Sequence, residues 1–356
     1  MTERVRLAFA IPGDLSTPTG GYVYDRRVMA LLPEHGVDAR VLALPDSFPF
    51  PSQDDLAFTR AALESVSPDE AILADGLAWG AVPPALARAV RAPAIALCHH
   101  PLGLEAGLSR EQARALIDNE RAVLGLSAHV IVTSNATRAT LVERFSLAPE
   151  SITVAEPGVD RAPRARGSGS AAVHIVAVGS VVPRKGYDIL VDALTQVRDL
   201  DWRLTIVGAL DRAPQAVANL RAQIDAADLT SRISFAGAAD DPALAALYDS
   251  SDLFVSASRY EGYGMVLAEA MVRGLPIVST TGGAAADTVP GDAALKVPPE
   301  NAPALADALR RAISDAALRA RLAAAALAAS RNLPTWDRAA KTIATVVQAV
   351  HQKGRR

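Results

Sequence analysis

The chain alternates between short apolar runs and longer amphipathic stretches along almost its whole length. The short runs have the length and composition of strands, and the longer ones repeat apolar residues at helical spacing. This alternation predicts βα units around parallel sheets. We expect strands at 5–10, 37–44, 71–74, 94–98, 130–133 and 152–155, and again at 174–178, 203–207, 233–235, 253–256 and 276–279. Helices are expected between them, including one at 109–126 that begins with a capping box.

The alternation is interrupted once, near the middle of the chain. The stretch at 158–171, GVDRAPRARGSGSA, has no apolar period and is rich in proline, glycine and serine, as interdomain connections are. With 356 residues the chain is long enough for two domains. We therefore predict an α/β fold with Rossmann-like, doubly wound domains at 1–160 and 172–335, and a linker at 161–171. A C-terminal helix within 336–356 could pack back on the first domain or pack on the second.

Charge and composition exclude several classes of protein. The net charge is −3, divided into −7 up to Asp160 and +4 beyond it, so neither part has the positive field that nucleic acid requires. Cys98 is the single cysteine, which rules out an intrachain disulfide and a cysteine-based metal cage. No apolar run reaches the roughly 18 residues that span a bilayer. The segment at 12–14, PGD, also ends the apolar N-terminal run too early for a secretory signal. These features predict a cytoplasmic protein.

The first candidate site is the stretch at 258–276, SRYEGYGMVLAEAMVRGLP. Glu261 and Glu269 bracket a segment in which a strand passes through a glycine-rich turn into a helix near Gly264. The free N–H groups at such a helix start favour an anion. The two carboxylates could accept hydrogen bonds from hydroxyls at the two ends of a bound nucleotide sugar. The alternative is that one glutamate merely begins the helix and the other is solvated.

A second candidate lies about 80 residues upstream, in VAVGSVVPRKGYDIL. A strand ends at Gly179, and the loop after it carries Arg184 and Lys185. A guanidinium fork beside an ammonium suits a diphosphate whose negative charge grows as it leaves. The alternative is a solvated surface pair. Lysine is rare in this chain, with four among 36 basic residues, and that rarity favours the functional interpretation.

These motifs together resemble the donor-binding domain of the retaining family 4 glycosyltransferases. That family has the GT-B architecture of two facing Rossmann-like domains with an interdomain cleft. VGSVVPRKG, the E-x7-E run from ALYDSSD to LPIVST, and GGAAADTVP follow in the family's order over 173–310. The first half resembles the family more weakly, through PTGGYVYD and through APAIALC followed by two histidines. Two departures are Ala257, where proline is frequent, and the 282–287 element, which lacks the usual glutamate.

The resemblance implies a role for each matched residue. Arg184 and Lys185 would stabilise the diphosphate leaving group, Glu261 would contact sugar hydroxyls, and Glu269 would contact the ribose. The donor would also touch the strand end and the helix start, at Gly179, Tyr263, Gly264, Met265 and Val266. In the first half, the glycine loop and the histidines would lie near the donor phosphates, the sugar and the acceptor. The residues concerned are Gly20, Gly21, His99, its rival His100, and Glu105 on the acceptor side.

The implied activity is retaining transfer of a hexose from a UDP- or GDP-sugar to a hydroxyl acceptor. A small soluble acceptor is favoured over a lipid, because the first half is acidic and lacks a basic amphipathic helix. No cofactor or metal is expected, since no Asp-x-Asp motif is placed to hold a diphosphate-bound cation. One alternative is a sugar-nucleotide 2-epimerase, which would need further acid/base carboxylates and histidines. The other is a non-catalytic nucleotide-sugar-binding protein, which would not need to bury the charged set.

Overall fold

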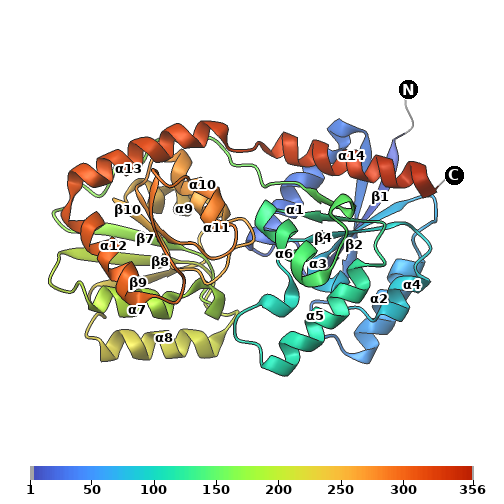
Figure 1. The fold of residues 1–356 in the computed structure, drawn as a ribbon, viewed down its shortest axis with the longest axis horizontal. Helices are drawn as coiled ribbons and strands as arrows, with labels where there is room; N and C mark the ends of the chain where they lie inside the picture. Colours follow the sequence, from blue (N-terminus) through green and yellow to red (C-terminus); the bar gives the residue numbers. More distant parts are fainter. Residues whose placement is uncertain (1–3, 355–356) are drawn as a thin grey trace. The chain divides into compact units, whose positions relative to one another are not determined.

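The computed structural model describes residues 4–354, in which the chain forms two compact units. The first unit combines Met1–Gly158 with Pro334–Arg356, and the second is the continuous segment Val159–Leu333. Each unit contains one six-stranded sheet whose neighbouring strands all run parallel, flanked by helices (Figure 1). The predicted α/β fold with two doubly wound parallel sheets is therefore confirmed.

The sheet of the first unit has the order β2-β1-β3-β4-β5-β6. Its register aligns, for example, Val5 with Val37 and Ile72 with Ala94. Most of its strands read as continuous apolar runs because helices cover both faces. The strands are β1 Val5–Pro12, β2 Val37–Leu44, β3 Ala71–Asp75, β4 Ala94–Cys98, β5 His129–Val132 and β6 Ile152–Val154.

The helices of the first unit divide between the two faces of this sheet. They are α1 Gly20–Leu31, α2 Gln53–Glu64, α3 Gly76–Trp79, α4 Pro84–Ala89, α5 Arg110–Leu124, α6 Asn135–Phe145 and α14 Trp336–Gly354, with short turns η1 Leu32–His35, η2 Leu102–Leu104 and η3 Pro149–Ser151. One core joins α2 to α6 with alternate residues of the strands. Helix α14 packs against α1 and against β1, β2, β3 and β5. The C-terminal helix thus belongs to the first unit.

The second unit has the strand order β12-β11-β10-β7-β8-β9. The strands are β7 Val173–Val178, β8 Trp202–Val207, β9 Ile233–Gly237, β10 Leu253–Ser256, β11 Ile277–Thr280 and β12 Ala294–Val297. Counted from β9, this is the 3-2-1-4-5-6 order of the Rossmann fold, whose strand order reverses between β7 and β10. Ligands of such sheets bind outside the carboxyl ends of the strands at this reversal.

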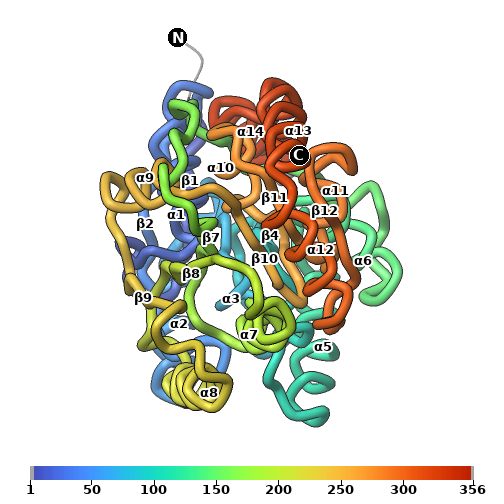
Figure 2. The backbone as a smooth tube through the Cα atoms, turned by 90° about the vertical axis from the view of Figure 1, so that its left-hand side faces the viewer, coloured from blue at the N-terminus to red at the C-terminus, as the bar shows by residue number. Residues whose placement is uncertain are grey.

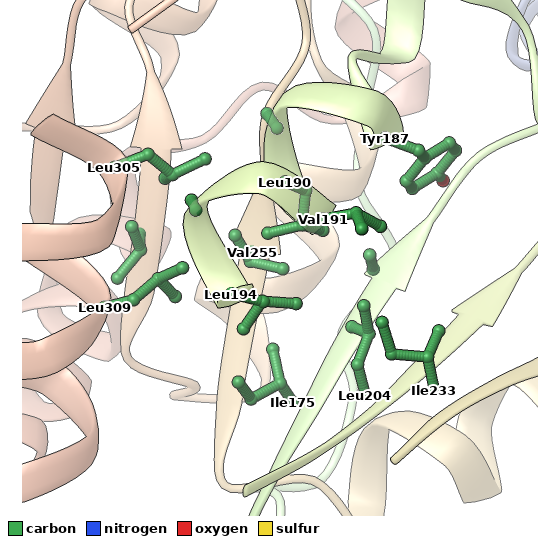
Figure 3. Close-up of a cluster of buried hydrophobic side chains, with 14 of the residues drawn as sticks. Ile175, Tyr187, Leu190, Val191, Leu194, Leu204, Ile233, Val255, Leu305 and Leu309 are labelled. Carbon is green, nitrogen blue, oxygen red and sulfur yellow. The ribbon is translucent and has the colours of Figure 1, made fainter. Parts of the chain in front are cut away.

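Helices cover both faces of the second sheet. They are α7 Tyr187–Thr195, α8 Pro214–Ala226, α9 Asp241–Asp249, α10 Met265–Val272, α11 Ala285–Thr288, α12 Ala302–Ser314 and α13 Ala316–Ala329, with turns η4 Pro183–Lys185 and η5 Ser330–Asn332. Ile175 lies in the core under α7, α8 and α12 (Figure 3), whereas the next residue, Val176, packs with α9, α10 and α13. Figure 2 shows α7 and α8 on one side of β7 and β8, and α10 and α13 on the other.

The stretch predicted as a linker does not connect the units freely. It contains no helix or strand, but its backbone bonds to the second unit. Ala165 N–H donates to the Arg273 carbonyl at 2.9 Å, and Ser168 Oγ donates to Asp252 Oδ2 at 2.6 Å. Amino-acid composition cannot distinguish a free linker from one that is hydrogen-bonded to a neighbouring surface. None of the helices within residues 4–354 is both long and apolar enough to cross a membrane.

Candidate active site

The strand-order reversal of the second unit brings the predicted charged residues together. Strand β7 leads into η4, which carries Arg184 and Lys185, and β10 leads into the loop that carries Glu261. The two loops are tied by a backbone hydrogen bond from Arg259 N–H to the Arg184 carbonyl, at 2.8 Å. Because β7 and β10 are neighbours, side chains far apart in the sequence meet at the carboxyl ends of these two strands.

Glu261 is a buried carboxylate between two cations. Lys185 Nζ donates to its Oε1 at 2.6 Å, and Arg184 Nη1 lies 3.5 Å from its Oε2. Ser258 Oγ donates a further hydrogen bond to Oε1 at 2.6 Å. Burial by itself would raise the pKa of Glu261, but Lys185 and Arg184 outweigh it and lower that pKa to about 2. Two cations and one carboxylate give the cluster a formal charge of +1.

Gly179, at the end of β7, makes room for the lysine. Its φ of +148° is one that residues with a side chain rarely adopt, and a Cβ built there would lie 2.7 Å from Lys185 Cε. The lysine stem therefore passes directly over the strand end. The backbone of Glu261 is fixed as well, since its N–H donates to the Gly282 carbonyl at 3.1 Å and its carbonyl accepts from Ala284 N–H at 2.9 Å.

Helix α10 follows this loop and places Glu269 on its second turn. Met265 and Val266 open the helix, so their N–H groups have no acceptor within it. Glu269 Oε2 accepts a hydrogen bond from the Tyr248 hydroxyl at 2.8 Å. Burial raises the pKa of Glu269, while this bond and the charge of Arg273 oppose the rise. The four residues at 263–266 predicted to cradle phosphate and the predicted ribose contact thus lie on one short segment.

In the first unit, a second group of polar side chains lies at the carboxyl ends of the strands. His99 follows β4, Asp75 ends β3, and Asp25 lies on α1, which follows β1. His99 Nε2 lies 3.1 Å from Asp25 Oδ1 and 3.6 Å from Asp75 Oδ2. Asp25 and Asp75 are 0% and 3% exposed, and the Tyr24 ring meets the imidazole edge-on with the ring centroids 5.2 Å apart.

This buried group holds protons near neutral pH. Burial, and then the charge of Asp25, raise the pKa of Asp75 to about 7, although His99 acts in the opposite direction. Burial would lower the pKa of His99, but Asp25 and Asp75 outweigh it, so that pKa is raised. The raised pKa values favour the protonated form of Asp75 and the charged form of His99.

Among the described residues, Asp25, Asp75 and His99 also form a group with the donor types that bind metals. Their nearest oxygen and nitrogen atoms all lie within 4.8 Å of one another. Both carboxylates nevertheless face the same nitrogen, Nε2, so one ring N–H or a shared proton already joins them. These separations of 3.1 and 3.6 Å are also those of a hydrogen bond and an ion pair, so proton sharing accounts for the arrangement as it stands.

The two neighbouring histidines have different surroundings. His99 joins the carboxylates, whereas His100 Nε2 lies 3.6 Å from Glu105 Oε2, just beyond η2. Gly20 and Gly21 are the first two residues of α1, and a Cβ on Gly21 would lie 3.4 Å from His99 Cδ2. The predicted glycine loop and His99 thus lie against each other.

Three side chains of these two groups were not expected from the sequence: Asp25, Asp75 and Tyr248. Asp75 could have been recognised in the sequence, because it is the only charged residue of the strand AILAD and stands at its carboxyl end. Asp25 and Tyr248 lie within amphipathic helices, where a buried polar residue cannot be told from a solvated one without the packing.

Two family models match the chain, one in each half. The model described as Glycosyltransferase Family 4 matches residues 18–162, and the model described as Glycosyl transferases group 1 matches residues 172–315. The chain belongs to the family 4 glycosyltransferases. Within this family 4 chain, the first match contains Asp25, Asp75 and His99, and the second contains the Arg184–Lys185–Glu261 cluster.

Individual relatives agree with the family 4 assignment. The D-inositol 3-phosphate glycosyltransferase of Pseudarthrobacter chlorophenolicus is 30% identical over 263 residues, covering 70% of this chain and 61% of that protein. The chain spans about three fifths of the length of these curated relatives.

Solved structures of similar proteins show the fold. Sucrose-phosphate synthase from Thermosynechococcus elongatus matches with a TM-score of 0.84 and 22% identity, covering 98% of this chain and 100% of that one. Anabaena HepE in complex with UDP-glucose matches with a TM-score of 0.76 and 20% identity, covering 97% and 100%. The GT-B fold expected for a family 4 glycosyltransferase is therefore confirmed.

Proposed function

We propose that this protein transfers a hexose from a nucleoside-diphosphate sugar to a hydroxyl acceptor, with retention at the anomeric carbon. The observation that carries the proposal is the Arg184–Lys185–Glu261 cluster at the strand-order reversal of the second unit, in which two partly buried cations flank a buried carboxylate. Two cations side by side at the carboxyl ends of parallel strands are suited to bind an anionic ligand. A diphosphate, whose charge increases as the sugar leaves it, is the anion that such a cluster stabilises best during reaction.

In the second unit, each candidate residue then has a chemical task. Lys185 and Arg184 neutralise the departing diphosphate, and the N–H groups at the start of α10 bind its phosphate oxygens. When the diphosphate engages Lys185, Glu261 becomes available to accept hydrogen bonds from sugar hydroxyls. Glu269 accepts a hydrogen bond from the ribose.

In the first unit, His99 is the candidate contact to the transferred sugar. As an imidazolium held by Asp25 and Asp75, it can donate a hydrogen bond to a sugar hydroxyl and offset the negative charge of the donor. His100 and Glu105 are the candidates for the acceptor side. We assign no protein nucleophile: the acceptor attacks on the face that the diphosphate leaves, and a leaving phosphate oxygen takes the acceptor proton.

The comparisons support a UDP-linked donor and a small polar acceptor. Anabaena HepE is described with UDP-glucose, and the Pseudarthrobacter relative is named for an inositol phosphate acceptor. Both substrates would suit the buried, hydrogen-bonding groups described above. We expect no requirement for a metal ion, because Arg184 and Lys185 provide the positive charge that a diphosphate needs.

Thermal stabilisation by UDP, GDP, ADP, TDP and NAD tests the donor assignment. We expect one nucleoside diphosphate to raise the Tm, and Lys185→Ala to weaken its binding by about 10- to 100-fold, the value of a hydrogen bond to a charged group. Lys341→Ala, which removes an exposed lysine on α14, is the control and should bind normally. Stabilisation by none of the diphosphates would contradict the proposal. Proton NMR of the product of the active sugar donor then gives the anomeric configuration.

One observation favours the 2-epimerase alternative: the Asp25–Asp75–His99 group places two carboxylates beside an imidazole, the pKa of Asp75 is raised to about 7, and that of His99 is raised. Incubating UDP-N-acetylglucosamine with the protein in D2O, without an acceptor, separates the two activities. An epimerase would invert C2 and incorporate deuterium there, whereas a transferase would leave C2 unchanged. We expect no deuterium at C2, since both matching family models describe glycosyltransferases.

A further inference from the structure

Tyr248 is a buried residue near the start of the quoted E-x7-E run; no role is predicted for it from the sequence, and its hydroxyl contacts Glu269. It lies on α9, is 0% exposed, and donates to Glu269 Oε2 at 2.8 Å. Its ring stacks with Phe254, with the ring centroids 6.1 Å apart, and the Arg273 guanidinium carbon lies 4.5 Å from its centroid. These contacts hold the ring, and through it the hydroxyl, in one position.

The same contacts leave one half of the Glu269 carboxylate for another partner. Within residues 4–354, Oε1 of Glu269 receives no hydrogen bond, and Tyr248 is the one side chain that donates to the carboxylate. Arg273 donates to the Glu269 backbone carbonyl at 3.0 Å instead of to the carboxylate. A partly buried carboxylate with one anchored oxygen is suited to accept a hydroxyl donor at the other.

We propose that Tyr248 is a positioning residue that makes the second unit selective for the ribose hydroxyls of a nucleoside diphosphate. The inference rests on the proposed function, in which Glu269 contacts the ribose. A glutamate carboxylate rotates broadly about its last bond, and the Tyr248 hydroxyl fixes that rotation before the ligand arrives. Oε1 then accepts from the ribose without an ordering cost at binding. Selectivity follows because a ligand without the hydroxyl leaves this carboxylate oxygen unpaired.

The test compares two ligands that differ only in the ribose hydroxyls. We would measure by calorimetry the affinities of the whole chain for UDP and 2′,3′-dideoxy-UDP, with the GDP pair in parallel, for the unaltered protein and Tyr248→Phe. We expect the unaltered protein to prefer the ribonucleotide by roughly tenfold or more. Tyr248→Phe should lose most of that preference, with UDP binding weakened by about tenfold and dideoxy-UDP binding unchanged.

Two further variants separate the hydroxyl from the packing around it. Phe254→Leu disturbs the contact with the Tyr248 ring but keeps the hydroxyl, so it should lower the Tm and retain the ribose preference. Glu269→Gln should lose the preference, and adding Tyr248→Phe to it should change little, because the two residues act as one unit. Glu269→Gln also tests the ribose contact without relying on the folding of Tyr248→Phe.

The outcomes distinguish this inference from the proposed function. Equal weakening of both ligands in Tyr248→Phe, or an undiminished ribose preference, would overturn the positioning role while leaving the donor site in place. Failure of the unaltered protein to bind any of the four nucleotides would overturn the proposed function and this inference together.

Discussion

Glu261 shows how a single buried residue can link stability and function. A carboxylate that is 5% exposed is tolerated only because Lys185 and Arg184 stand beside it, and these are the cations that we assign to the diphosphate. The chain therefore carries its own counter-ion for the period when no diphosphate is bound. Without Glu261, the partly buried Lys185 ammonium would lose the carboxylate at 2.6 Å, and the folded protein would be less stable.

The first prediction concerns the acid stability that Glu261 provides. Its folded-state pKa of about 2 lies below the ordinary 4.5, so its contribution is complete above about pH 5 and is lost as the pH falls toward 2. The shift corresponds to about 3 kcal/mol. Glu261→Gln should lose about 3 to 5 kcal/mol at pH 7 and show a flatter decline between pH 5 and 2. Guanidinium unfolding at several pH values measures both effects.

The matched control for Glu261→Gln is Asp307→Asn, which neutralises an exposed carboxylate on α12 of the same unit. Its unfolding free energy should stay within about 0.5 kcal/mol of the unaltered protein at every pH. An equal pH dependence in Glu261→Gln and the unaltered protein would contradict the ion-pair assignment.

The second prediction concerns Asp75, whose ionisation lowers the stability of the folded protein because its pKa is raised, whereas that of Glu261 is lowered. Its folded-state pKa of about 7 exceeds the ordinary 3.8, so ionisation of this carboxyl destabilises the folded protein. The destabilisation is absent below about pH 4, grows as the pH rises, and is complete above about pH 7. Asp75→Asn should therefore stabilise the protein by on the order of 2 kcal/mol at pH 8, and by less at pH 5. It should also lower kcat about tenfold, since His99 loses a partner.

Thermal melts at pH 5 and 8, together with initial rates, measure the effects of Asp75→Asn. Asp69→Asn, an exposed change shortly before the same strand, should alter neither quantity. If Asp75→Asn stabilised the protein more at pH 5 than at pH 8, the Asp75 carboxyl would not be the destabilising group.

At the residue scale, candidate site residues at strand ends can be predicted from the sequence better than the side chains that contact them. Arg184, Lys185 and Glu261 could be expected near one another because parallel strands end at a common edge. The pairing of His99 with Asp25 could not, because it depends on which strands are neighbours and on how α1 lies over them. Tyr248 escapes notice for the same reason, since α9 and α10 are separated by a strand in the sequence.

At the element scale, a close backbone contact stands at the point where α14 returns to the first unit. Gly158 ends the first segment of that unit, and a Cβ built there would lie 2.1 Å from the Trp336 nitrogen at the start of α14. Trp336 packs against the Tyr24 ring, with the ring centroids 6.0 Å apart, and Arg27 lies over its indole. The glycine therefore fixes where the helix begins to cover the sheet.

The third prediction tests this contact. Gly158→Ala should destabilise the first unit by about 1 to 3 kcal/mol, because either the helix start or the segment at 158 must move. Hydrogen exchange should show reduced protection of α14. Gly125→Ala is the control, since the nearest atom to its Cβ would be the Arg121 carbonyl oxygen at 3.4 Å. Unchanged protection of α14 in Gly158→Ala would show that the contact does not hold the helix.

Strand boundaries were the more predictable part of the elements. The runs at 37–44, 94–98 and 253–256 match the strands end for end, and turn-forming or polar residues stand at both ends of the first two. The 161–171 stretch was predicted less well. Its proline- and glycine-rich composition correctly excludes helix and strand, but the carboxylates of Asp249 and Asp252 that anchor it lie some 80 residues away.

At the scale of the whole molecule, the second unit should be separable. Its sheet and both of its hydrophobic cores are formed by residues 159–333 alone. The fourth prediction is that this segment, expressed by itself, folds cooperatively and retains the diphosphate-induced rise in Tm. Circular dichroism melts with and without UDP and GDP measure this. Residues 1–158 alone should fold poorly, because the face that α14 covers would be exposed to water. Independent folding of 1–158 would show that α14 is dispensable.

The path of the chain has a practical consequence for recombination. The polypeptide leaves the first unit at Gly158 and re-enters it at Pro334, so the half to which we assign the nucleotide is an insert within the other half. A chimera made with one crossover would separate α14 from the sheet it evolved with. Exchanging donor specificity between relatives therefore calls for two crossovers, near 158/159 and 333/334, which transplant the inserted half as a cassette.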